Sequence, residues 1–245
     1  MCAVNVISNN KIKEITKLHQ KKYREDSNLF IAEGFKAVEE LIDKNCEIID
    51  IYSTKAFDFK TTIIEENQMK KIATTSSPCE ILAIAKQIKT QTSELKSLKK
   101  IILLDSISDP GNLGTIIRSA SAFGIEGIIL FGDCVELYSP KVVRSATGNL
   151  FKTKITTVKN KEELKKIFPS HKLVATSLSK ENNISIKDCK KFDKYIIMFG
   201  SEATGLSKEL QALSDNNIKL EMTNNVESLN LSISASIILY ELFTI

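Results

Sequence analysis

The stretch Asp-Pro-Gly-Asn-Leu-Gly-Thr-Ile-Ile-Arg, which runs from residue 109 to residue 118, decides the fold. Its first four residues have the composition of a tight turn, because proline presets one φ angle and glycine permits a positive one. Asn112 is a candidate N-cap for a helix over residues 113–123. Apolar strands are predicted on either side, at 100–104 and 127–131, so the stretch predicts a strand–turn–helix–strand unit.

Outward from this unit, strands and helices continue to alternate to the C-terminus. The further helices are expected at 141–148, 162–168, 206–213 and 228–243, and the further strands at 172–176, 195–199 and 217–222. This alternation predicts an α/β domain whose mostly parallel sheet is covered on both faces. In such sheets the ligand crevice lies beyond the carboxyl ends of the strands. The last helix is almost free of charge, which predicts that it is buried.

The N-terminal part is predicted to be a smaller α/β unit. It begins with a lysine-rich amphipathic helix over residues 10–23, followed by a polar turn at 24–28. A strand at 29–32, a helix at 33–42, a strand at 48–52 and an apolar run at 81–85 come next. We therefore expect an N-terminal domain at 1–90, a polar linker at 91–99, and a C-terminal domain at 100–245.

Composition excludes several classes of protein. No apolar run has the length of a membrane span, and the first ten residues lack the pattern of a secretory signal, so we expect a cytoplasmic protein. The five cysteines are widely scattered and the two histidines lie in no ligand-like cluster, so no metal is expected. The net charge of +4 permits nucleic-acid binding without demanding it.

Two later loops fall at the same expected edge of the sheet. Residues 199–206 place glycines on both sides of a polar pair that includes Glu202, which allows a ligand to approach the backbone. In the loop at 223–230, Ser228 is a candidate N-cap, and Asn230 and Ser232 are uncharged polar residues that need partners. Taken singly, each loop is also compatible with an ordinary turn or helix cap.

Together, the order and spacing of the three loops resemble the SpoU/TrmH family of RNA ribose methyltransferases. The matching residues are Asn112 to Arg118, then Gly200-Ser201-Glu202 with Gly205, then Ser228-Leu229-Asn230 with Ser232. The N-terminal part resembles the substrate-binding domain that often precedes this catalytic domain, through residues 19–24, 30–34 and 77–83. The resemblance therefore covers nearly the whole chain.

The resemblance implies a catalytic domain with a C-terminal trefoil knot, a homodimer, and S-adenosylmethionine as the cofactor. Backbone groups at the knot loops would bind the cofactor, at the matching positions Thr176, Ser177, Leu178, Gly200, Leu220 and Leu229. Many family members have a proline after the position of Leu220, where this chain has Glu221.

The implied reaction is methylation of a ribose 2′-hydroxyl in RNA. Arg118 would bind the RNA phosphate and orient the hydroxyl, because arginine is nearly always protonated and is a poor resting base. Its catalytic partners would be Asn112, Glu202, Ser228 and Asn230. The candidate RNA contacts outside this site are Lys21, Lys22, Tyr23, Arg24 and Arg144.

Other functions remain open at this stage. The separate N-terminal domain favours rRNA as the substrate, and a tRNA 2′-O-methyltransferase is the alternative. A non-catalytic RNA-binding or ribosome-assembly protein on the same fold is a second alternative, against which the intact motif residues argue. A dehydrogenase is excluded because the dinucleotide glycine loop is missing.

Overall fold

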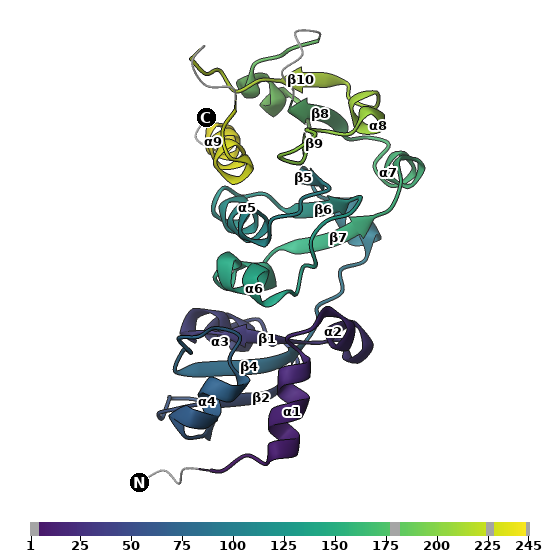
Figure 1. The fold of residues 1–245 in the computed structure, drawn as a ribbon. Coiled ribbons are helices and arrows are strands. Elements are labelled where there is room, and N and C mark those ends of the chain that lie inside the picture. The colour runs from purple at the N-terminus through teal and green to yellow at the C-terminus, as the bar shows by residue number, and fades with distance from the viewer. Residues whose placement is uncertain (1–4, 177–181, 224–227, 244–245) are drawn as a thin grey trace. The chain divides into compact units, whose positions relative to one another are not determined.

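Two units, each with its own sheet, make up the chain in the computed structural model (Figure 1). Unit 1 comprises Met1–Ile88 and Glu136–Lys152, and unit 2 comprises Lys89–Val135 and Thr153–Ile245. The structure describes residues 5–176, 182–223 and 228–243. The expected α/β fold with a mostly parallel sheet, preceded by an N-terminal α/β domain, is confirmed.

The described part of unit 2 is built on a six-stranded parallel sheet in the order β10-β8-β9-β5-β6-β7. The strands are β5 (Lys100–Asp105), β6 (Gly127–Phe131), β7 (Lys154–Val158), β8 (Lys172–Thr176), β9 (Tyr195–Phe199) and β10 (Asn216–Ile218). Strand β7 was not among the predicted strands, because its two threonines interrupt the apolar run.

Helices cover both faces of this sheet, with α5 and α9 on one side and α7 and α8 on the other (Figure 1). The helical segments are η1 (Thr92–Leu95), α5 (Pro110–Ala122), α7 (Lys161–Ile167), η3 (Ile186–Lys191), α8 (Lys208–Gln211) and α9 (Leu231–Phe243). Alternate strand residues, such as Leu103 and Met198, pack against Leu164 of α7 and Leu210 of α8. Burial on both faces explains why the strands are continuously apolar.

The described part of unit 1 has a four-stranded sheet in the order β1-β4-β2-β3. Strand β4 (Ile81–Lys86) is antiparallel to both β1 (Leu29–Glu33) and β2 (Ile48–Ser53), and β2 is parallel to β3 (Thr62–Ile63). The helical segments are α1 (Asn9–Lys17), α2 (Lys21–Ser27), α3 (Phe35–Asp43), α4 (Glu66–Ile72), α6 (Pro140–Ala146) and η2 (Asn149–Phe151).

The segment Glu136–Lys152 belongs to unit 1 although it lies between two strands of unit 2 in the sequence. Aromatic contacts hold it there, since the ring of Phe30 lies 4.7 Å from that of Tyr138 and 5.6 Å from that of Phe151. The Tyr138 hydroxyl also donates a hydrogen bond to the carbonyl of Ile88, at 2.8 Å.

Three local predictions were wrong. The helix expected over 10–23 and the turn expected at 24–28 are two helices, α1 and α2, because the chain bends so that the Arg24 guanidinium reaches the Leu18 carbonyl, at 2.6 Å. The last helix begins at Leu231 rather than Ser228, with Asn230 as its cap. This helix is not wholly buried either, since Ile233, Tyr240 and Phe243 are more than half exposed.

Candidate active site

The candidate site lies at the carboxyl ends of β5 and β9, which are neighbours in the sheet. Leu104 is in register with Phe199, so the loops that follow these two strands begin side by side. The first leads into α5 and carries residues 106–109, and the second carries residues 200–207. Sheet topology thus brings together two motifs that are about ninety residues apart.

The start of α5 turns the side chain of Asn112 inward. Asp109 is the N-cap, and its side chain accepts a hydrogen bond from the Asn112 amide at 2.7 Å, while Pro110 occupies the first turn. The prediction that Asn112 caps this helix is therefore wrong. Asn112 is buried, and its Nδ2 donates a hydrogen bond to Oε1 of Glu202. This bond joins the first motif to the second.

The loop carrying Glu202 is a tight hairpin fixed by its own backbone. Ser201 and Gly205 exchange two backbone hydrogen bonds, at 3.1 and 2.9 Å. A Cβ atom on Gly200 would lie 2.0 Å from the carbonyl carbon of Gly205, so no other residue fits at position 200 without moving the loop. The glycine is therefore required by the close approach of two backbone segments.

A buried carboxylate that the sequence analysis missed holds this loop from below. Asp105 ends β5, is 3% exposed, and accepts hydrogen bonds from the Ser207 amide at 2.8 Å and from the Ser106 hydroxyl at 2.9 Å. The sequence did contain a signal for this residue, because Asp105 directly follows an apolar strand and a charged residue in that position needs a buried partner. Asp105 and Asn112 thus tie the glycine loop at two points.

The third motif is ordered by Asn230. Its Oδ1 accepts hydrogen bonds from the Ser232 amide at 2.9 Å and from the Ser232 hydroxyl at 2.7 Å, which caps α9. Helix α9 packs on α5, where the hydroxyls of Ser236 and Ser119 are 2.7 Å apart. The polar residues at the start of α9 therefore satisfy one another in part.

The second and third motifs line one cavity of about 720 Å³ within unit 2, and the first motif is joined to it through the hydrogen bond between Asn112 and Glu202. This volume falls in the range of small-molecule sites, roughly 300–1,000 Å³. Its walls include the following residues of the predicted site: Thr176, Gly200, Glu202, Leu220, Ser228, Leu229 and Asn230. Ser177 and Leu178 lie outside the described residues. The cavity combines apolar walls with a few polar groups, and Gln211 is a lining residue that the sequence analysis did not name.

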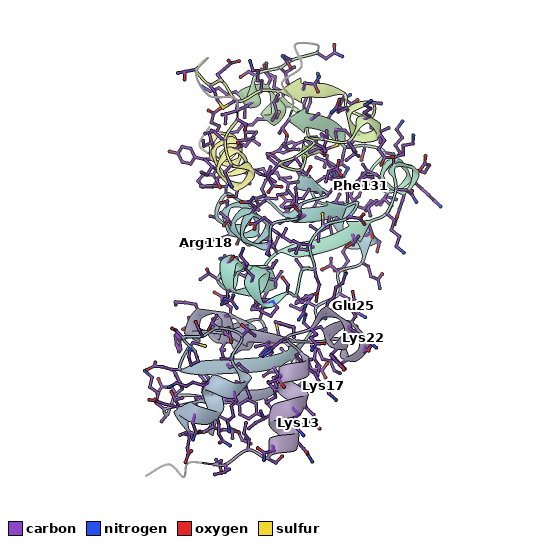
Figure 2. All side chains as sticks on the ribbon, viewed as in Figure 1. Lys13, Lys17, Lys22, Glu25, Arg118 and Phe131 are labelled. Carbon is purple, nitrogen blue, oxygen red and sulfur yellow. The ribbon has the colours of Figure 1, made fainter. Side chains whose placement is uncertain are left out.

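Arg118 is exposed on α5, less than two turns beyond Asn112, and does not line the cavity (Figure 2). Within residues 5–176, 182–223 and 228–243 it makes no hydrogen bond and no ion pair. Its guanidinium therefore has donors available for an anion. Glu221 lies beyond β10, and its carboxylate is 3.9 Å from Lys219 and largely exposed.

The predicted RNA contacts of unit 1 differ in their surroundings. Lys21 and Lys22 are exposed on α2, and the amine of Lys17 lies 5.5 Å from the ring centre of Tyr23. Figure 2 shows Lys13 and Lys17 along α1 with Lys22 close by on α2. These lysines form an exposed basic surface.

The two arginines of the predicted RNA surface are engaged in contacts within unit 1. Arg24 is 3% exposed and its guanidinium forms two hydrogen bonds with the carboxylate of Glu136. Arg144 donates to the Thr74 hydroxyl at 2.7 Å and to Glu33 at 3.4 Å. A buried and fully paired Arg24 cannot also reach an RNA phosphate, so its role is to hold Glu136 and the Leu18 carbonyl in unit 1.

The described residues include neither a candidate metal site nor a helix that could span a membrane. No group of three His, Cys, Asp or Glu residues is arranged to hold a metal ion there. None of the helices in the described part of the chain is both long and apolar enough to cross a membrane.

Comparison with known proteins matches this geometry. A profile of the SpoU rRNA Methylase family matches residues 99–240, which is more than half of the chain. The chain belongs to the SpoU rRNA Methylase family. A second profile, the MRM3-like substrate binding domain, matches residues 9–83 of unit 1.

Relatives of this SpoU family member cover its whole length. It is 29% identical over 260 residues to the 23S rRNA (guanosine(2553)-2′-O)-methyltransferase RlmP of Bacillus subtilis (strain 168), with 99% of each chain covered. It is 34% identical over 145 residues to the 23S rRNA (uridine(2479)-2′-O)-methyltransferase of Streptomyces viridochromogenes, which covers 57% of this chain and 50% of that protein. The AdoMet-bound rRNA methyltransferase from Sinorhizobium meliloti superposes with a TM-score of 0.85 at 28% identity, covering 97% of this chain and 95% of that one.

Proposed function

We propose that this protein transfers a methyl group from S-adenosylmethionine to a ribose 2′-hydroxyl of ribosomal RNA. The observation that carries the proposal is the single cavity lined by the second and third motifs, to which the Asn112–Glu202 hydrogen bond joins the first. The full-length similarity to RlmP and to the AdoMet-bound rRNA methyltransferase supports the reaction class and the cofactor.

The residues of the cavity fit the cofactor. Leu220, Leu229 and Ile238 provide apolar surface for an adenine ring, and the backbone at Gly200 and Leu220 provides donors and acceptors for its edge. Glu202 and Asn230 provide polar groups for the remainder of the molecule. When bound, S-adenosylmethionine supplies a methyl group already activated by its sulfonium, so the chemistry requires alignment of the nucleophile and removal of one proton.

Arg118 is proposed to bind a phosphate of the substrate and to orient the attacking hydroxyl. Its guanidinium stays protonated, presents a planar fork that matches phosphate oxygens, and has no partner among the described residues. The hydroxyl proton then passes to an oxygen of the bound phosphate, while the guanidinium keeps its own proton. Glu202 holds Asn112, and both keep the loop and α5 in fixed register beneath the substrate.

Ribosomal RNA is the favoured substrate over tRNA. The relative covered along 99% of both chains acts on 23S rRNA, and the substrate-binding domain is part of that alignment. We leave the target base open, because one relative is named for a guanosine and another for a uridine. An rRNA substrate also agrees with the expected cytoplasmic location.

A homodimer is part of the proposal. Ile233, Tyr240 and Phe243 form an exposed apolar surface on α9, and Phe123 adds its ring 5.7 Å from that of Tyr240. A second copy would bury this surface, and Tyr240→Asp should then yield a monomer in light scattering. A monomeric wild-type protein would refute the dimer. The trefoil knot stays a prediction, because residues 177–181 and 224–227 lie outside the described part.

The decisive experiment measures methyl transfer from radiolabelled S-adenosylmethionine to rRNA purified from a strain that lacks the gene. We expect incorporation at one ribose, mapped by resistance of the adjacent phosphodiester to alkali, and we expect total tRNA to remain unlabelled. A folded protein that binds the cofactor without labelling rRNA or tRNA would favour the assembly-protein alternative. Failure to bind the cofactor in calorimetry would overturn the enzyme proposal altogether.

A further inference from the structure

Three phenylalanines gather on the surface of unit 1 outside the residues considered so far. Phe35 begins α3, and Phe57 and Phe59 lie in the loop after β2. The ring centres of Phe35 and Phe57 are 5.7 Å apart and those of Phe57 and Phe59 are 5.6 Å apart, with interplanar angles of 19° and 18°. We call these three residues the phenylalanine cluster. Their near-parallel rings form a stacked surface.

The phenylalanine cluster lies at the surface of unit 1 rather than in its core. Phe35 is 42% exposed, and Phe57 and Phe59 are only partly buried. Unit 1 already has an apolar core around Ile31, Ile72 and Leu82, to which the cluster contributes no residue. Contiguous exposed aromatic surface of this kind marks a binding site more often than a structural need.

Lysines border the rings. The amine of Lys36 lies 5.9 Å from the ring centre of Phe35, and the amine of Lys55 lies 5.7 Å from that of Phe57. Both side chains are more than half exposed, although Lys36 is also paired with Glu39 and Lys55 with Glu80. Aromatic rings interleaved with cations are the arrangement by which proteins hold single-stranded nucleic acids, since the rings stack on bases and the cations meet phosphates.

Beside the rings is a hollow of about 410 Å³. Besides the three phenylalanines, it is lined by Glu39, Asp43 and Asp58, whose carboxylates are hydrogen-bond acceptors. Nucleobases carry N–H donors on their edges, so a base stacked on a ring can donate to these carboxylates. A hydrocarbon partner would remove water from these charged groups without replacing its hydrogen bonds, which disfavours a lipid or an apolar peptide.

We propose that the phenylalanine cluster is a nucleobase-binding site, at which an unpaired base of the RNA substrate stacks on the rings. The inference rests on the proposed function and adds a specific contact surface to it. All of the residues involved fall within residues 9–83, the segment matched by the substrate-binding profile. The outer face of α9 provides a contrast, because its exposed residues Ile233, Tyr240 and Phe243 carry no charge, and we assign it to a second copy instead.

The test compares Phe57→Ala with Phe57→Trp in the full-length protein. The probe is a fluorescently labelled, unstructured 16-nucleotide RNA of mixed sequence, titrated by anisotropy, together with the KM for rRNA in the methyl-transfer assay. Loss of one stacked base should weaken binding roughly 5- to 150-fold. The tryptophan variant should retain binding, because its ring also stacks. Val6→Ala is the control, since Val6 is an exposed apolar residue of the same unit outside the phenylalanine cluster.

The outcomes separate this inference from the proposed function. Support requires that Phe57→Ala raises the KM for rRNA while kcat and cofactor affinity stay at the wild-type level, and that ultraviolet cross-links to RNA map to residues 54–60. If the wild-type enzyme methylates rRNA and Phe57→Ala leaves both RNA affinity and KM unchanged, the inference fails and the proposed function stands. Cross-links confined to Lys21 and Lys22, or a change only in the capture of a protein partner, would also overturn it.

Discussion

Beside the cavity of unit 2, buried polar side chains are held by hydrogen bonds to the glycine loop, whereas around the phenylalanine cluster of unit 1 the lysine side chains remain largely exposed. Asp105 and Asn112 are both buried and tie the glycine loop through Ser207 and Glu202. Lys36 and Lys55 each have one carboxylate partner and are more than half exposed.

This difference separates two kinds of site. A set of donors and acceptors locked in place aligns reacting groups without reorganisation, which is what a chemical step needs. Exposed rings and mobile lysines adapt to a flexible polymer, which is what RNA capture needs. We therefore expect substitutions in the cavity to lower kcat or cofactor affinity, and substitutions in the phenylalanine cluster to raise the KM for RNA.

The largest effect is expected from Gly200→Ala, which should displace the glycine loop that lines the cavity and leave the phenylalanine cluster unaffected. The added Cβ would lie 2.0 Å from the backbone of Gly205, so the glycine loop must open. Calorimetry should detect no binding of S-adenosylmethionine, while affinity for the 16-nucleotide RNA stays within twofold of wild type. Lys208→Ala is the control, because Lys208 is exposed just after the same loop and does not line the cavity. Normal cofactor affinity in Gly200→Ala would contradict the described loop.

The next largest effect is expected from Arg118→Lys, which should reduce kcat by roughly 10²–10³-fold. This is the usual effect of losing one positioned hydrogen-bond donor to a charge that develops in the transition state. Lysine keeps the charge and loses the forked contact, so charge alone does not compensate. Single-turnover methyl transfer to rRNA measures the change, with cofactor affinity expected to be unaltered. Full activity in Arg118→Lys would refute the assigned role. Lys165→Ala, on the exposed side of α7, serves as the matched control.

Double-mutant cycles compare the two sites by the coupling free energy between paired side chains. A cycle on Asn112 and Glu202, each changed to alanine, should give a coupling of about 1–3 kcal/mol in urea unfolding, because removing Glu202 leaves the buried amide of Asn112 without its acceptor. The matched cycle on Lys55 and Glu80 should give about 0–1 kcal/mol, as for exposed ion pairs. Equal coupling free energies for the two pairs would contradict the view that the first site is held rigidly by hydrogen bonds and the second is not.

The smallest expected effect is a loss of folding stability at low pH, and it is confined to unit 2. Burial lowers the pKa of His171 below its ordinary value of 6.5, while its Nε2 lies 2.8 Å from the Leu98 carbonyl. The unfolded chain therefore binds the proton more readily, so stability is complete above about pH 6.5 and falls as the pH drops below it, by at most about 1.4 kcal/mol per pH unit.

Hydrogen exchange at pH 7.5 and 5.5 measures this effect segment by segment. Amides of β8 in unit 2, next to His171, should lose protection at the lower pH after correction for intrinsic exchange. His171→Asn should abolish the loss, because asparagine does not titrate in this range. An unchanged pH dependence in that variant would assign the effect to another group.

Much of the fold could be predicted because its determinants are local. The apolar runs at 100–104, 127–131 and 195–199 form buried parallel strands as expected, since each is too apolar to face water on either side. The helix expected from about residue 113 begins three residues earlier, because Asp109 accepts the amide of Asn112 and takes the role of the cap. Helix ends depend on single hydrogen bonds, which the apolar pattern does not encode.

The candidate site was predictable in its residues and not in its contacts. Gly200, Glu202, Ser228 and Asn230 were named from their motifs, and all four line the cavity. Arg24 was named from a run of basic residues, and its burial against Glu136 depends on a segment more than one hundred residues away. The phenylalanine cluster was invisible for the same reason, since Phe35 meets Phe57 only through the pairing of β1 and β2 with β4.

The amino-acid sequence alone was enough to predict the alternation of strands and helices, the three motifs at the carboxyl ends of the strands, and the family. These features are periodic patterns or short spacings, and local propensity suffices to specify them. Only the tertiary structure decided that Asn112 bonds to Glu202, that residues 136–152 join unit 1, and that three phenylalanines share one surface. Contacts between distant segments depend on how the sheet closes and which side chains find partners there, and no single stretch of the chain carries that information.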